Sequence, residues 1–346
     1  MTETAFHRNN HYVPRLYLKH WATTQRRIQT YRTLVSDPRV PLWRDHSIEG
    51  VAFHAHLYTQ TIAGKETDDI ERWLDSEFEA PAEEALHKAI SDKRLTPTDW
   101  RRIVRFLAAQ DVRTPARLVE ALHRWETELP ALLDRTLKDA VRLHEKAKAS
   151  GKTLVQPPSA PNRDSFPLRV TTEIEPGEEM GKLKAEIVAG RALWLHRMPE
   201  LLTKTANVLH QHRWTILAPP RGLSWFTSDD PVIRLNYYKE NNYDFKGGWN
   251  NKGTEILLPL GPCHLLFTKV GERPVTRGGE VPLPLAKLIR RFIAEHATRM
   301  IFATEPDVEM SELRPRLVDA VRFQDEAEQL RRWHEEQSAA ERKLRS

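Results

Sequence analysis

The hydrophobic pattern changes its period along the chain, and this change constrains the fold more than any other feature. Up to about residue 63, and again over 213–305, short apolar runs bounded by Gly, Pro and Asn predict strands, with one helix predicted over 283–297. Over 67–212 the apolar residues mostly recur with helical spacing. Because the two patterns occupy separate stretches, they favour an α+β fold with mostly antiparallel sheets over a doubly wound parallel sheet.

This organisation predicts a single α+β domain over residues 1–305. In this domain a helical-bundle lobe, over about 67–212, packs against a β-rich lobe formed by 1–63 and 213–305. Residues 306–346 form a C-terminal extension that carries a charged helix. We expect this helix to serve homo-oligomerisation if the protein assembles.

Local signals refine the helical region. Thr96-Pro97-Thr98-Asp99 carries the residue types of a helix start, with a capping residue followed by proline and an early acid. Several prolines over 150–178 predict a long loop. After this loop, the pattern over 178–212 predicts a long helix or a helix pair.

Composition excludes several classes of protein. The chain has 53 Lys and Arg residues against 48 Asp and Glu, a net charge of +5 that permits contact with nucleic acid without requiring it. Its single cysteine, Cys263, excludes an internal disulfide framework and a cysteine-rich zinc site. We find neither a signal-peptide pattern nor an apolar run long enough to span a bilayer, so we expect a cytoplasmic protein without membrane contact.

An aromatic and basic segment lies at the start of the chain, from Asn10 to Trp21. N-terminal residues are usually frayed and polar, but here Tyr12, Val13 and several following residues are apolar. This composition predicts that the segment is docked on the domain.

Three segments, in order along the chain, resemble a bacterial and fungal family known as domain of unknown function 4238. They are Asn10-His11-Tyr12-Val13-Pro14-Arg15, Gln110-Asp111-Val112-Arg113-Thr114-Pro115 and Phe226-Thr227-Ser228-Asp229-Asp230-Pro231-Val232. The resemblance covers roughly residues 9–305 and implies an α+β fold without any catalytic assignment. The family usually has Asn at the position of Asp230, so this chain carries an additional carboxylate there.

The polar residues of these segments are the candidates for chemistry. His11 has the side chain suited to proton transfer near neutral pH, Arg113 can clamp a phosphate, and Asp229 can orient the histidine or accept a proton. We therefore predict His11, Arg113 and Asp229 as catalytic residues. The predicted substrate-binding residues are Asn10, Arg15, Gln110 and Asp230.

Together with the net positive charge of the chain, these predicted site residues indicate a nuclease, or another phosphate-ester hydrolase, that acts on RNA or DNA. A divalent metal, Mg²⁺ or Mn²⁺, would be held by Asp229 and Asp230. In the alternative hypothesis, the network of His11, Arg113 and Asp229 is structural, and the protein is a non-catalytic interaction or oligomerisation module. The order Ser-Asp-Asp-Pro is also typical of an ordinary turn.

One weaker pattern lies in the second helical stretch. The spacing between Arg191 and His196 resembles that of HEPN-type ribonucleases, in which the two side chains cooperate on phosphate. Ala192 stands where those enzymes tend to carry a polar residue. We therefore favour the interpretation that both residues simply belong to a helix face.

Overall fold

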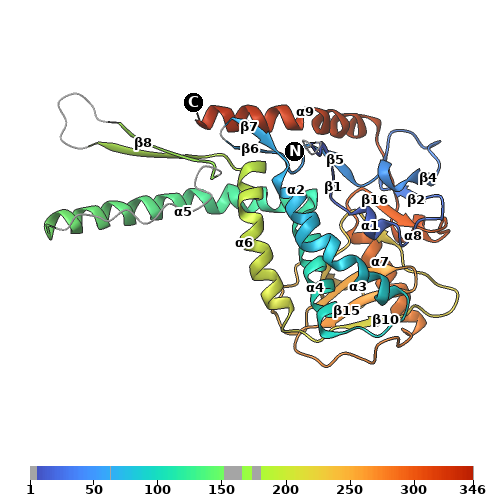
Figure 1. Cartoon of the computed structure of the whole chain (residues 1–346). Coiled ribbons are helices and arrows are strands. Elements are labelled where there is room, and N and C mark those ends of the chain that lie inside the picture. Colours follow the sequence, from blue (N-terminus) through green and yellow to red (C-terminus); the bar gives the residue numbers. More distant parts are fainter. Residues whose placement is uncertain (1–5, 63, 152–165, 174–180, 346) are drawn as a thin grey trace, which may run out of the picture.

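The computed structural model describes residues 6–62, 64–151, 166–173 and 181–345, and it confirms the α+β fold (Figure 1). The α-helices are α1 (Arg15–Leu18), α2 (Asp69–Leu74), α3 (Ala80–Ile90), α4 (Pro97–Val112), α5 (Pro115–Ala149), α6 (Arg191–Leu209), α7 (Leu283–His296), α8 (Met310–Leu313) and α9 (Ala320–Arg345). A π-helical turn, Asp75–Glu79, joins α2 to α3, and a 3₁₀ turn covers Ile48–Gly50.

The strands are mostly antiparallel. They are β1 (Asn9–His11), β2 (Arg27–Arg32), β3 (Leu34–Val35), β4 (Trp43–Ser47), β5 (Phe53–Ala55), β6 (Gln60–Ile62), β7 (Lys65–Thr67), β8 (Leu168–Glu173), β9 (Lys182–Ile187), β10 (Thr215–Leu217), β11 (Thr227–Ser228), β12 (Ile233–Lys239), β13 (Asn242–Asp244), β14 (Glu255–Gly261), β15 (His264–Lys269), β16 (Met300–Ala303) and β17 (Leu317–Val318). The larger sheets have the orders β10-β15-β14-β12-β13 and β11-β16-β2-β4. Two-stranded pairs complete the set, and β17 runs parallel to β3.

The helical part of the core is built around α4. This helix begins at the predicted position with a capping box, in which Thr96 and Asp99 satisfy each other's backbone N–H groups. Ile103, Phe106 and Leu107 are then buried in the larger apolar core, which also takes residues from α3, α6 and the N-terminal segment. A second core lies where α7 packs beside the strands.

Two sequence predictions between α5 and α6 are wrong. Strand β8 lies within the predicted loop over 150–178, and β9 lies within the helix predicted over 178–212. Of the described residues in the second range, only those of α6 are α-helical, and residues 152–165 and 174–180 lie outside the described part of the chain. Residues 168–173 pair with 182–187 in a regular antiparallel register. The segment Lys182–Ile187 consists largely of helix-forming residue types, but its apolar residues alternate, and pairing with a distant strand decides its conformation.

The C-terminal helix α9 crosses the N-terminal strands at the top of the molecule in Figure 1, whereas α5 and the β8–β9 hairpin extend away from the body. Arg299 and Glu326 form an ion pair that attaches the first half of α9 to β16. Among the described residues, no helix combines the length and the apolar character needed to cross a membrane.

Candidate functional site

The N-terminal segment is docked, as predicted. Strand β1 pairs with β5, and the backbone N–H groups of Tyr12 and Val13 both approach the carbonyl of Ala52. The side chain of Asn10 is fully buried and holds the backbone on both sides: its Nδ2 donates to the His7 carbonyl, and its Oδ1 accepts from the Tyr58 N–H at 3.1 Å. Asn10, predicted to bind substrate, thus has structural partners.

Gln110 and Arg113 share a helix face, as their spacing predicts, and both hold the N-terminal backbone. Gln110 Nε2 donates to the Tyr12 carbonyl at 2.9 Å, and Arg113 Nη2 donates to the His11 carbonyl at 2.9 Å. Arg113 is 1% exposed and forms an ion pair with Glu79. These contacts occupy the guanidinium of Arg113 and the amide nitrogen of Gln110, whereas the buried Gln110 Oε1 has no partner among the described residues.

The buried guanidinium of Arg113 belongs to a cluster that the sequence did not indicate. Besides Glu79, it lies over the ring of Tyr58, 5.6 Å from the ring centroid, and Glu71 Oε2 is 3.9 Å from Nη2. Burial raises the pKa of Glu71 to about 7, although the charge of Arg113 opposes this shift.

The ring of His11 does not meet the side chain of Arg113. Its Nε2 donates to the Glu49 carbonyl at 3.3 Å, and the ring packs against Phe53. Burial, followed by the charge of Arg15, lowers the pKa of His11 to about 4, so the imidazole is neutral at pH 7. Arg15 itself is exposed.

Asp229 and Asp230 are neighbours in sequence but their carboxylates have separate partners. Asp229 accepts backbone N–H groups from three successive residues, Thr298, Arg299 and Met300, at 2.9, 2.7 and 3.1 Å. Burial nevertheless raises the pKa of Asp229 to about 6. The carboxylate therefore fixes the start of β16.

Asp230 interacts with a different part of the molecule. Its Oδ1 accepts a hydrogen bond from Thr114 Oγ1 at 3.2 Å, while Oδ2 lies 3.6 Å from Arg117 Nη2 and 3.8 Å from His296 Nε2. Burial raises the pKa of Asp230 as well. Because the two carboxylates serve separate sets of donors, this geometry does not favour a divalent metal between them, and the metal site stays a prediction.

All three family segments nevertheless reach one cavity of about 470 Å³, which we call the signature cavity. The segments contribute Tyr12, Pro115 and Asp229, respectively. The remaining wall comes from β2, β3, β5, α5, β16 and α9 with their adjoining residues. Its members are Arg32, Leu34, Phe53, His54, Ala116, Val119, Thr298, Arg299, Met300, Phe323, Glu326, Ala327, Gln329 and Leu330. The volume lies in the usual range for small-molecule sites.

Two polar groups of this wall have no partner within the described chain. Arg32 is exposed and forms no ion pair there, and the hydroxyl of Tyr12 makes no hydrogen bond with any described residue. Burial, aided by Asp229, raises the pKa of Tyr12 far above its usual value, so the phenol keeps its proton and can donate it.

Two further polar groups of the wall have known partners. His54 Nδ1 donates to the Ala55 carbonyl at 2.8 Å, so Nε2 is left as an acceptor. Arg299, by contrast, is already paired with Glu326. Sequence reasoning missed Arg32, because an exposed arginine carries no local signal of a site.

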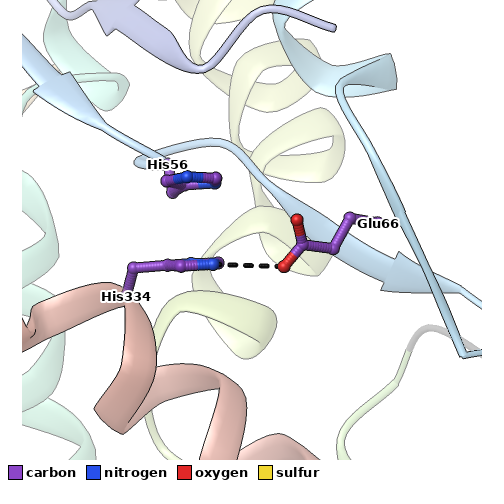
Figure 2. Close-up of side chains that lie close together, drawn as sticks. All are labelled: His56, Glu66 and His334. Atoms are coloured by element: carbon purple, nitrogen blue, oxygen red, sulfur yellow. Dashed lines mark ion pairs between the residues drawn. The ribbon is translucent and has the colours of Figure 1, made fainter.

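A second polar cluster consists of His56, Glu66 and His334, whose ligand-type atoms lie within 4.8 Å of one another. Figure 2 shows the two imidazole rings stacked, with 3.7 Å between centroids and 12° between planes, and Glu66 beside the edge of His334. An imidazole binds a metal along a nitrogen lone pair in the ring plane. Stacked rings direct these lone pairs side by side, which opposes coordination of one ion.

The hydrogen bonds of this cluster also fix both tautomers. Arginine can only donate, so Arg191 Nη1 at 2.9 Å makes Nδ1 of His334 the acceptor and leaves the proton on Nε2, which faces Glu66 at 3.1 Å. In the same way, Arg8 Nε donates to His56 Nε2 at 2.8 Å. The cluster is therefore a set of neutral histidines that accept from arginines, and it does not fit a metal centre.

Arg191 does not form an open site with His196. Its guanidinium is completely buried and is held by α9, where Glu341 accepts from both Nε and Nη2 at 3.0 Å and Ser338 accepts at 3.2 Å. The ring of His196 packs against Phe166 instead. The favoured interpretation of this pair as part of a packed helix agrees with these contacts.

Comparison with known proteins gives a family and nothing more specific. A family model described as Protein of unknown function (DUF4238) matches residues 9–307, which include every segment that reaches the signature cavity except α9. Neither a curated protein nor a solved structure matches the chain. Because the match covers most of the sequence, the chain belongs to the DUF4238 family, as its motifs suggested.

Proposed function

We propose that the protein binds a small amphipathic anion, a carboxylate or a phosphate monoester with an apolar body, in the signature cavity. The observation that carries the proposal is the convergence of all three family segments on this one cavity. A pocket with a largely apolar wall and a few uncommitted polar groups is the usual form of a small-molecule site.

The cavity offers hydrogen-bond donors to the anionic head group of such a ligand and apolar surface to its body. The guanidinium of Arg32 and the hydroxyl of Tyr12 are donors without partners in the described chain, which suits an anionic head group. Phe53, Met300 and Phe323 offer apolar surface to the body of the ligand. The carboxylate of Asp229 opposes an anion only weakly, since three backbone N–H groups already surround it.

The experiment compares anions with neutral analogues of the same shape. Titration calorimetry on the full chain would use medium-chain fatty acids, alkyl phosphates and the matching alcohols. We expect the anions to bind and Arg32→Gln to weaken them about tenfold, because a hydrogen bond to a charged group contributes about 1.5–3 kcal/mol. Arg39→Gln, on an exposed loop, is the matched control. Equal binding of anions and alcohols would refute the proposal.

Hydrolysis of RNA or DNA is the second candidate, and the uncommitted Arg32 favours it because arginine suits a phosphate group. It further requires His11 and Asp229 to exchange protons with a substrate, whereas both hold backbone groups. The purified protein would be incubated with RNA and DNA in Mg²⁺, Mn²⁺ or EDTA. Cleavage lost in His11→Ala would support hydrolysis, and no difference between the two proteins would favour the structural role of His11.

A further inference from the structure

Helix α5 continues far beyond the part that packs on the protein. Trp125 is its last buried residue, and every later residue of the helix is exposed or half-buried. In Figure 1 this part of α5 extends away from the body. We call residues 126–148 the distal arm.

The distal arm has one apolar face. Viewed down the helix axis at 3.6 residues per turn, leucines and alanines gather on one side while nearly all Lys, Arg, Asp and Glu side chains take the other. The apolar face consists of Leu129, Leu132, Leu133, Leu137, Ala140, Leu143 and Ala147. Leu132 and Leu143 are 53% and 57% exposed, so the described chain leaves this face uncovered there. In proteins, most of the stability of an amphipathic helix comes from the packing of its apolar face.

The β8–β9 hairpin beside the arm also has one apolar face and one charged face. Because side chains alternate across a strand, Leu168 and Val170 share one face with their cross-strand partners Ile187 and Ala185, while Arg169 and Glu186 pair on the opposite face. Val170 is 51% exposed. The extension therefore presents apolar surface from two elements.

The two halves of the distal arm carry opposite net charges. The first half, 126–134, has three acidic residues and neither Lys nor Arg, a balance of −3. The second half, 135–148, has five Lys and Arg residues against two acidic ones, a balance of +3. Two identical arms in antiparallel orientation bring each acidic half beside a basic half, whereas parallel arms would bring like charges together.

We infer that the distal arm is a homodimerisation element, in which it pairs antiparallel with the same arm of a second copy of this chain. Such an interface is isologous, with the same surface used by both partners about a two-fold axis. Glu341 and Glu326 of the C-terminal helix α9 pair with Arg191 and Arg299 of the same chain, and the role of α9 in oligomerisation stays a prediction.

Light scattering coupled to size-exclusion chromatography, over a wide range of protein concentration, tests the inference on the full chain. We expect the mass of two chains for the wild type. The double variant Leu133→Glu/Leu137→Glu places charges on the apolar face and should raise the dissociation constant about tenfold or more. Thr127→Glu/Ala131→Glu adds the same charges to the opposite face and should leave the mass unchanged.

Because none of the four substituted residues belongs to either core, the variants should keep the thermal transition and helical circular dichroism of the body. A wild type with the mass of one chain would overturn the inference, and so would a dimer that the Leu→Glu variant leaves intact. In the alternative arrangement, the β8–β9 hairpin covers the apolar face of the arm within one chain. The wild type would then have the mass of one chain, which would also refute the inference.

A charge exchange tests the antiparallel orientation separately. Glu126→Lys/Glu128→Lys/Asp134→Lys makes both halves of the arm basic and should weaken the dimer. Adding Arg135→Glu/Lys138→Glu/Arg142→Glu to the same chain reverses both halves and should restore it, since opposite charges meet again. Failure of the second set to restore the dimer would overturn the antiparallel orientation.

Discussion

At the scale of single residues, two adjacent carboxylates show how position decides what an acid does. Asp229 accepts hydrogen bonds from three backbone N–H groups, whereas Asp230 has one hydroxyl donor and looser contacts with Arg117 and His296. An unsatisfied buried donor costs more than a hydrogen bond gains. Asp229 should therefore matter far more to stability than Asp230.

We expect Asp229→Ala to lower the free energy of unfolding by about 3 kcal/mol, because it leaves three backbone donors without an acceptor. Asp230→Asn is the matched comparison. Its amide oxygen can still accept from Thr114, and it removes a like charge beside Asp229, so its effect should stay below about 1 kcal/mol. Urea denaturation at pH 7 measures both variants. An equal loss would contradict the assigned role of Asp229.

At the scale of elements, the second half of α9 is attached through a buried arginine, Arg191. Four residues on one face of the helix, His334, Gln337, Ser338 and Glu341, contact Arg191 at the start of α6. Gly190 permits this approach, since a Cβ there would lie 2.5 Å from Gln337 Oε1. The same helix then forms one wall of the signature cavity.

Removing the counter-charge of Arg191 should loosen this attachment. Glu341→Gln leaves the buried guanidinium without a carboxylate, and we expect a loss of about 3 kcal/mol. Hydrogen exchange should rise along α9 before it rises in the strands. Glu335→Gln, at an exposed position of the same helix, controls for the loss of an acidic charge. Unchanged protection of α9 in Glu341→Gln would show that other contacts hold the helix.

The elements also show what local sequence determines. Thr96 and Asp99 predict the start of α4 because a capping box is a property of four adjacent residues. The segment Lys182–Ile187 could not be assigned in this way, since its strand depends on pairing with β8. Gln110 and Arg113 share a face as predicted, but spacing alone cannot tell a backbone carbonyl from a ligand as their acceptor.

At the scale of the whole molecule, the signature cavity could not be predicted from local sequence. Its family segments are visible in the sequence, but Phe323 and Leu330 come from the far end of the chain, beyond the family match. No periodicity relates α9 to Arg32 or Tyr12, because their proximity depends on how the chain folds over a long separation. The sequence therefore predicted the motifs but not the cavity that joins them.

Acid sensitivity is another property of the whole molecule. His11, His20 and His56 are each largely shielded from water, and burial is the main cause that lowers the pKa of each to about 4. A histidine with a lowered pKa in the folded state stabilises the protein above its unfolded pKa of 6.5, and this contribution is lost as the pH falls towards 4. Asp229 and Glu71 have the opposite sign, because burial raises their pKa values to about 6 and about 7, and the pKa values of Asp230 and Glu255 are raised as well. The histidines with lowered pKa values, which also include His46, His54, His196 and His334, outnumber these four carboxylates.

We therefore expect the free energy of unfolding to fall between pH 6.5 and pH 4, and His20→Asn should reduce this slope. His20 Nδ1 donates to the Leu260 carbonyl at 2.7 Å, and the amide of asparagine can keep that donor without taking up a proton. The difference in stability between the wild type at pH 6.5 and pH 4 should shrink by about 2 kcal/mol in the variant. His123→Gln, whose histidine side chain is 91% exposed, should leave the slope unchanged. Urea denaturation at a series of pH values measures the slope, and an identical slope in His20→Asn and the wild type would mean that His20 is not among the groups responsible.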